Sequence, residues 1–178
     1  FWEGYVGNGE PYGLINLRLA RSCGRIGDTR YKDKRIQGFN PCAEQGLEPY
    51  ETCCLAETFL PNIASKEELA DVCKLLYRVC KHSLRLPCHL PQTQEVVWKN
   101  ARMGIGVTGY LQATEEQREW LKEVYDELRE FDKSYSGDRG WPASIKLTTI
   151  KPSGTLSLLP GVTSGCHPAY ARFLIRRI

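Results

Sequence analysis

The stretch Asn40-Pro-Cys-Ala-Glu44 is the most informative part of the sequence. It lies in a segment, residues 36–47, that lacks helical periodicity and carries two glycines and a proline, which predicts an extended strand or a loop. In an extended backbone every second residue points to the same side. The prediction is therefore that Asn40, Cys42 and Glu44 share one pocket. An amide, a thiol and a carboxylate together suit radical or acid/base chemistry on vicinal hydroxyl groups.

A second thiol follows this stretch. Cys53 comes eleven residues after Cys42, and Gly46 and Pro49 between them break regular structure and let the chain return. The two cysteines can form a dithiol or a disulfide, or one of them can pair with a thiol elsewhere. Neighbouring residues of a strand face opposite sides, so only one of Cys53 and Cys54 can enter the pocket. An ordinary buried cysteine is the alternative reading.

Two glycine-containing stretches are candidates for nucleotide contacts. Residues 102–109 contain Gly-x-Gly-x-x-Gly, but they follow a predicted helix, whereas a dinucleotide loop follows a strand. Residues 151–155, Lys-Pro-Ser-Gly-Thr, follow a predicted strand and lack the spacing of a Walker loop. The backbone N–H groups around Ser153, Gly154 and Thr155, with the two hydroxyl groups, can surround a phosphate, and the N-terminus of a following helix would assist. A plain turn is the alternative.

The remaining pattern predicts one α/β unit with no internal repeat or linker. Ser65, with Glu68 three residues later, has the form of a capping box at the start of a helix. The apolar stripe Trp120, Val124, Leu128 and Phe131 predicts a helix that faces the core. We expect helices over 12–21, from 65 to before Pro87, over 94–103 and over 114–135, a basic loop over 22–34, and a strand over 145–150.

Composition excludes several classes of protein. The chain has 178 residues, 42% of them hydrophobic and 25% charged, so it is expected to fold. It has no apolar run of about 18 residues, which argues against a membrane protein. A net charge of +3 is too small to indicate nucleic-acid binding. The apolar ends and the single methionine, Met103, suggest an internal fragment of a longer protein.

The eight cysteines favour a reducing compartment, the cytoplasm, because disulfide scaffolds belong to shorter secreted chains. The cysteines and histidines of residues 73–89 are candidate zinc ligands. The lack of a Cys-x-x-Cys spacing there argues against a zinc site. Cys73 and Cys80 are seven residues apart on the predicted helix. We therefore expect them on one face as buried thiols.

Taken together, these motifs resemble the catalytic core of ribonucleotide reductases. Asn40-Pro-Cys-Ala-Glu44, the block from Tyr50 to Phe59, residues 102–109, and Lys-Pro-Ser-Gly-Thr-Leu-Ser from Lys151 occur in the order of that family. The spacing from Cys42 to Cys53 and the motif Cys-Cys-Leu-Ala-Glu-Thr-Phe resemble those of the adenosylcobalamin-dependent branch, and within it those of the monomeric ribonucleoside-triphosphate reductases. The resemblance implies part of a ten-stranded α/β barrel with a central finger loop.

The resemblance also implies roles for individual residues. Cys42 carries a thiyl radical, Glu44 acts as base on the 3′-hydroxyl, Asn40 orients it, and Cys53 is one of two reducing thiols. Ser153, Gly154 and Thr155 bind the substrate phosphate. The implied cofactor is adenosylcobalamin, the substrate a ribonucleoside triphosphate, and the reductant thioredoxin or a similar dithiol, with no nucleic acid and no membrane involved.

Three further expectations accompany this interpretation. The isolated segment is expected to be inactive, because the second reducing thiol of the family lies outside it. One alternative is a reductase whose radical arrives from a separate metal-containing subunit. Another is a non-catalytic module that binds nucleotide or zinc.

Overall fold

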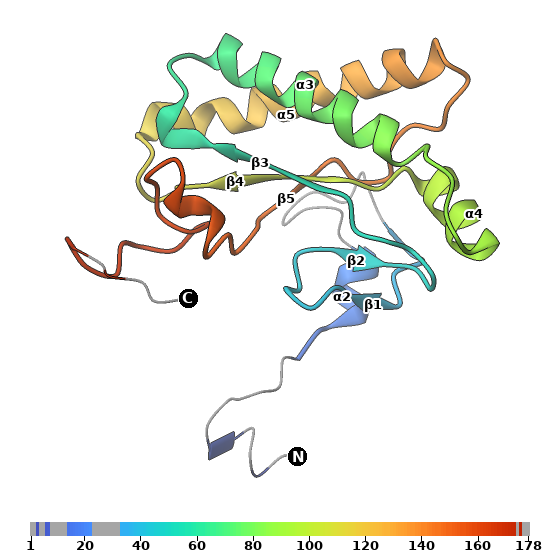
Figure 1. The fold of residues 1–178 in the computed structure, drawn as a ribbon, viewed down its shortest axis with the longest axis horizontal. Helices are drawn as coiled ribbons and strands as arrows, with labels where there is room; N and C mark the ends of the chain where they lie inside the picture. Colours follow the sequence, from blue (N-terminus) through green and yellow to red (C-terminus); the bar gives the residue numbers. More distant parts are fainter. Residues whose placement is uncertain (1–2, 4–5, 8–13, 23–32, 174, 176–178) are drawn as a thin grey trace.

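Three parallel strands, with two long helices packed on one of their faces, form the centre of the structure (Figure 1). The computed structural model describes residues 3, 6–7, 14–22, 33–173 and 175. In chain order the elements are α2 (Leu17–Ser22), β1 (Gly38–Phe39), β2 (Gly46–Leu47), β3 (Leu55–Phe59), the 3₁₀ turn η1 (Leu60–Asn62), α3 (Lys66–Ser83), α4 (Pro91–Asn100), β4 (Gly104–Thr108), α5 (Glu115–Gly137), β5 (Thr148–Thr149) and the 3₁₀ turn η2 (Leu156–Leu158).

The sheet has the order β3-β4-β5. β3 and β4 pair in parallel along their whole length, from Leu55 opposite Gly104 to Phe59 opposite Thr108, and β5 continues on the other edge of β4. Parallel neighbours require crossover connections. Helices supply both of them: α3 and α4 lie between β3 and β4, and α5 lies between β4 and β5. The alternation of strands and helices confirms the predicted α/β class.

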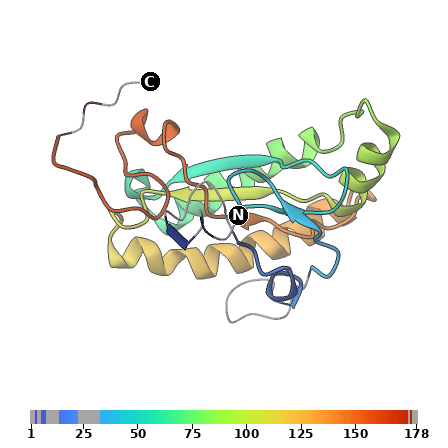
Figure 2. The same cartoon turned by 90° about the horizontal axis from the view of Figure 1, so that it is seen from below.

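The core lies between this sheet and the helices α3 and α5, which lie side by side (Figures 1 and 2). The stripe predicted to face the core does so: Val124 and Leu128 are buried, and Trp120 and Phe131 pack against the buried cluster. Cys73 and Cys80 are also part of this cluster, as the helical spacing predicts. No helix among the described residues is both long and apolar enough to span a bilayer.

Side-chain caps set the starts of the two long helices. Ser65 caps α3 by accepting a hydrogen bond from Glu68 N at 3.2 Å. The Glu68 carboxylate accepts from Ala64 N at 2.6 Å, one residue before the position that the predicted box requires. α5 has a complete capping box between Thr114 and Gln117. Each cap satisfies backbone donors that the first turn leaves without helical partners.

A buried polar network joins α3 to α5. The Tyr77 hydroxyl lies 2.7 Å from Asp132 Oδ1 and 3.1 Å from Ser136 Oγ. Lys81 Nζ lies 3.2 Å from Asp132 Oδ1 and donates to Ser144 Oγ at 3.0 Å. Burial lowers the pKa of Lys81, since an apolar environment disfavours its charged form. The network satisfies polar groups that would otherwise be costly to bury.

Two predicted helices have different boundaries in the structure. Among its described residues, the helix expected over 12–21 begins at Leu17, because Asn16 Oδ1 accepts from Leu19 N at 2.9 Å and so caps the helix at that point. The helix expected over 94–103 is α4, which begins at Pro91, since proline is favoured in a first turn. It ends where Ala101 adopts a left-handed φ of 44°.

The predicted strand over 145–150 is narrower than expected, with β5 restricted to Thr148–Thr149. Lys146 and Leu147 nevertheless accept backbone hydrogen bonds from Met103 and Ile105. Residues 12–13, most of the basic loop expected over 22–34, and Cys23 lie outside the described residues.

Candidate active site

Asn40, Cys42 and Glu44 lie in the turn that joins β1 to β2, a hairpin on the side of the sheet opposite α3 and α5 (Figure 1). The prediction of an extended backbone is wrong for residues 40–45. Ala43 has a left-handed φ of 61°, and its N–H donates to Asn40 O at 2.9 Å. The Asn40 side chain closes the turn, because its Oδ1 accepts a hydrogen bond from Gln45 N at 3.0 Å. Asparagine side chains commonly bond to nearby backbone in tight turns. Strand alternation therefore does not govern these side chains.

The turn still brings the three predicted residues to one short loop. Cys42 is exposed and in no disulfide. Glu44 is half-buried, and its Oε2 is a buried atom with no hydrogen-bond partner among the described residues. Asn40 Nδ2 lies 4.0 Å from Cys53 Sγ. The geometry thus joins Asn40 to the second thiol and leaves a carboxylate oxygen for a partner.

Cys53 and Cys54 point in different directions, as the sequence predicts for neighbouring extended residues. Cys53 is exposed beside Asn40. Cys54 Sγ contacts Cys80 O on α3 at 3.8 Å, and its side chain packs against the core. Hydrogen bonding between the Cys54 and Cys80 side chains lowers the pKa of Cys54 and, together with burial, raises the pKa of Cys80. Only Cys53 therefore faces the turn.

The hairpin rests directly on the sheet. The Gln45 side chain is buried against Gly104, where a Cβ atom would collide with the Gln45 amide and lie 2.8 Å from Thr149 Cγ2. Thr149 Oγ1 also donates to Glu44 O at 2.7 Å. Glycine is needed at position 104 because the hairpin approaches the strand so closely. The Gly-x-Gly pattern thus lies within a strand, and it does not form a dinucleotide loop.

Buried ion pairs hold the base of the hairpin. Arg102, which is 1% exposed, lies 2.5 Å from Asp33 Oδ2 and 3.0 Å from Glu51 Oε1. Asn100 Nδ2 donates to both Glu48 and Glu51 at 2.9 Å. Two acidic residues that follow β2 are therefore tied to the segment that leads from α4 into β4. This network positions the turn relative to the sheet.

The predicted phosphate loop follows β5. Ser153 is buried with a φ of 50°, and its Oγ has no hydrogen-bond partner among the described residues. Gly154 and Thr155 continue the turn. The helix expected after it is only the three-residue turn η2, because Leu158 N and Leu159 N bond three residues back and the α-helical pattern does not continue. The loop lies on the same side of the sheet as the hairpin (Figure 1).

The sequence interpretation missed a polar cluster on β3 and β4. Thr108 Oγ1 donates to Glu57 Oε1, and Lys151 Nζ lies 3.7 Å from Glu57 Oε2. The Glu57 side chain is only 3% exposed. A lone glutamate in the strand Leu-Ala-Glu-Thr-Phe is a signal that could have identified it, because a buried carboxylate needs a partner.

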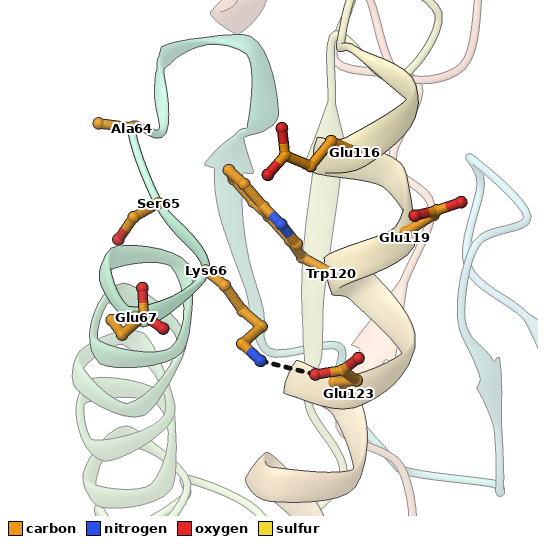
Figure 3. Close-up of a pocket in the computed structure, with 8 residues that line it drawn as sticks. All are labelled: Ala64, Ser65, Lys66, Glu67, Glu116, Glu119, Trp120 and Glu123. Carbon is orange, nitrogen blue, oxygen red and sulfur yellow. Dashed lines mark hydrogen bonds and ion pairs between the residues drawn. The ribbon is translucent and has the colours of Figure 1, made fainter.

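A cavity of about 400 Å³ lies elsewhere, between the N-terminal turns of α3 and α5 (Figure 3). Its wall includes Glu67, Glu116 and Glu119, with Trp120 beside them and a Lys66–Glu123 ion pair of 2.7 Å. Glu67 and Glu116 lie in the first turns of α3 and α5, where the helix dipole favours acidic side chains. Within the described residues no three His, Cys, Asp or Glu side chains form a metal-ligand group.

The fold and this site define a class of protein: a segment of an α/β barrel that presents thiols on the sheet face opposite its helices. Residues 13–131 match the ribonucleotide reductase barrel domain. The chain belongs to this family, and its parallel sheet is part of the family's α/β barrel.

Individual relatives agree with this assignment. The chain is 39% identical to a probable adenosylcobalamin-dependent ribonucleoside-triphosphate reductase of Dictyostelium discoideum, and 39% identical to the adenosylcobalamin-dependent ribonucleoside-triphosphate reductase of Euglena gracilis. Each match covers 96% of this chain, and respectively 23% and 24% of the relative. The chain therefore spans about a quarter of the length of these relatives.

A solved structure is also similar. A crystal structure of a B12-dependent (class II) ribonucleotide reductase superposes with a TM-score of 0.82 at 30% identity, and covers 94% of this chain and 28% of its own. The similarity to one solved chain over nearly all of these residues supports the barrel architecture.

Proposed function

We propose that this chain is a catalytic segment of an adenosylcobalamin-dependent ribonucleoside-triphosphate reductase, which converts ribonucleoside triphosphates to 2′-deoxyribonucleoside triphosphates. The observation that carries the proposal is the β1–β2 turn, with Cys42 exposed at the sheet face and Asn40 beside Cys53. The printed names of relatives that match 96% of the chain support the same activity.

The proposed chemistry begins at the ribose. Cys42, as a thiyl radical, takes the hydrogen atom from C3′, so an S–H bond forms as the C3′–H bond breaks and a radical remains on the sugar. Glu44 accepts the proton of the 3′-hydroxyl, a task that fits its unpartnered Oε2. Asn40 orients the same hydroxyl. The 2′-hydroxyl leaves as water after a thiol has protonated it.

Two thiols supply the electrons of the reduction. Cys53 and a cysteine of the same protein outside residues 1–178 give up two electrons and become a disulfide. Cys42 then returns the hydrogen atom to C3′. Thioredoxin or a similar dithiol protein reduces the disulfide for the next cycle. Cys53 suits this role better than Cys54, because it is exposed next to the turn, whereas Cys54 packs against α3.

Adenosylcobalamin, when bound, supplies the first radical by cleavage of its cobalt–carbon bond. Cys42 is the residue of this chain that such a cofactor must reach. Its exposure and its free thiol fit that requirement. We further infer that residues 1–178 belong to one barrel domain of a monomeric enzyme in the cytoplasm. The seven described cysteines are free, as a reducing compartment favours.

The proposal is tested in the full-length protein that contains this segment. Reduction of ribonucleoside triphosphates is measured with and without adenosylcobalamin and a dithiol. We expect turnover that requires the cofactor and is abolished by Cys42→Ser, while Cys88→Ser, a half-buried cysteine away from the turn, leaves turnover unchanged. Turnover that ignores adenosylcobalamin would assign the protein to the branch with a separate metal subunit. No turnover in any condition would refute the catalytic proposal.

A further inference from the structure

Lys151 lies across the sheet face that carries the candidate site. A Cβ atom on Gly106 would come within 3.0 Å of Lys151 Cγ and 3.2 Å of Lys151 Cδ. The lysine stem therefore passes directly over Gly106, at a place where the strand has no side chain. Lys151 is also the first residue of the stretch 151–155, in which Ser153, Gly154 and Thr155 are the predicted phosphate ligands.

Glu57 holds the ammonium group of this lysine. Lys151 Nζ lies 3.7 Å from Glu57 Oε2, a distance longer than a hydrogen bond. Thr108 donates to the other carboxylate oxygen and so fixes the orientation of the glutamate. Within the part of the chain that the structure describes, Glu57 Oε2 is buried with no hydrogen-bond partner, and the lysine side chain is 21% exposed. The ammonium donors are therefore available to a ligand.

The loop beside this lysine has no charge of its own. Residues 153–155 carry no charged side chain, and the Ser153 hydroxyl is buried without a hydrogen-bond partner among the described residues. Hydrogen bonds from a charged donor to phosphate are about twice as strong as neutral ones. Lysine is a common point-charge ligand of phosphate. A cation fixed beside such a loop suits a polyphosphate.

We propose that Lys151 is a ligand of the substrate's polyphosphate, and that Glu57 is a positioning residue that holds the lysine over Gly106. This inference rests on the proposed function, since it assigns a phosphate ligand to the same site. It adds a charged group to the neutral loop, and it accounts for a buried glutamate that the radical chemistry does not use.

Binding separates this proposal from catalysis. The dissociation constants of CTP and of cytidine, which lacks phosphate, are measured by calorimetry on the full-length protein without turnover. Lys151→Met should lower the affinity for CTP at least about tenfold, equivalent to about 1.4 kcal/mol, and leave the affinity for cytidine unchanged. Lys151→Gln should do the same, and Lys151→Arg should restore most of the CTP affinity. Lys122→Met, an exposed lysine on α5, is the matched control and should change neither ligand.

Glu57→Gln tests the positioning role. This substitution should lower the affinity for CTP less than Lys151→Met does, and it should leave the affinity for cytidine unchanged. The two changes together should cost no more than Lys151→Met alone, because both act through one ammonium group. If Glu57 were merely structural, Glu57→Gln would lower the affinity for both CTP and cytidine. Its effect on CTP affinity would then add to that of Lys151→Met in the double variant.

The proposal is overturned if Lys151→Met and Lys151→Gln each change CTP affinity less than threefold, or if they weaken cytidine as much as CTP. These results do not depend on turnover. A protein that binds CTP through Lys151 but reduces no nucleotide would contradict the proposed function and leave this inference standing.

Discussion

At the scale of single residues, the two adjacent cysteines make the sharpest prediction. Cys53→Ser should abolish multiple turnover, because Cys53 faces the turn between β1 and β2 and Asn40 contacts it. Cys54→Ser should retain turnover, since its sulfur contacts Cys80 O in the helix layer. Dithiol-dependent formation of deoxynucleotide by the two variants is the measurement. Loss of turnover in Cys54→Ser with activity in Cys53→Ser would reverse the assignment.

Glu44 provides a second prediction. Glu44→Gln keeps the shape of the side chain but removes the base, so kcat should fall by about 10² or more, the usual contribution of a general base. KM should change little, because the proposed phosphate contacts are elsewhere. Steady-state kinetics measure both constants. Glu67→Gln, an exposed residue in the first turn of α3, is the control, and a decrease in kcat of less than tenfold for Glu44→Gln would argue against the role.

At the scale of elements, the contact between hairpin and sheet depends on Gly104. Gly104→Ala places a Cβ atom against Gln45 and close to Thr149, so the hairpin must shift. We expect a stability loss of about 1–3 kcal/mol, typical of overpacking, and a loss of turnover. Gly137→Ala is the matched control, because nothing lies within 4 Å of a Cβ there and alanine favours a helix. Thermal unfolding and turnover of both variants test this prediction. Equal stability and equal turnover of the two variants would refute the contact.

The elements also indicate how far the sequence alone is informative. The helices α3 and α5, which Ser65 and Thr114 cap, are predicted well, because local caps and apolar stripes determine them. The end of α4 is not, because the chain turns at Ala101 and then buries Arg102 among carboxylates distant in sequence.

The candidate site has the same division. The opposite directions of Cys53 and Cys54 follow from local extended backbone and are predictable. The turn at Asn40 is not, because a side-chain hydrogen bond overrides strand geometry. The approach of Lys151 to Glu57 could not be predicted, since only the parallel register of β3, β4 and β5 brings such distant residues together.

At the scale of the whole molecule, the buried thiol layer predicts a response to alkaline pH. Burial raises the pKa of Cys73 from 9.0 to about 11. Folding therefore favours the protonated thiol, and its contribution is complete below about pH 9 and is lost as the pH rises through about 11. By linkage the loss can reach about 2–3 kcal/mol.

Denaturant unfolding of the full-length protein between pH 8 and 11.5 measures this effect. Cys73→Ala should lower stability at pH 8, but stability should then fall less steeply with pH than in the unmodified protein. Cys88→Ala, a cysteine outside the core cluster, should keep the original slope. Identical slopes for Cys73→Ala and the unmodified protein would contradict the account.

The proposed catalysis requires that one face of the sheet hold the ribose and the phosphates together. The most direct test is a crystal structure of the full-length protein with a bound ribonucleoside triphosphate. The account predicts C3′ within about 3.5 Å of Cys42 Sγ, a distance suited to reaction, and the phosphates in hydrogen-bond contact with Ser153 to Thr155. A nucleotide bound with its ribose away from Cys42, or on the helix side of the sheet, would contradict it.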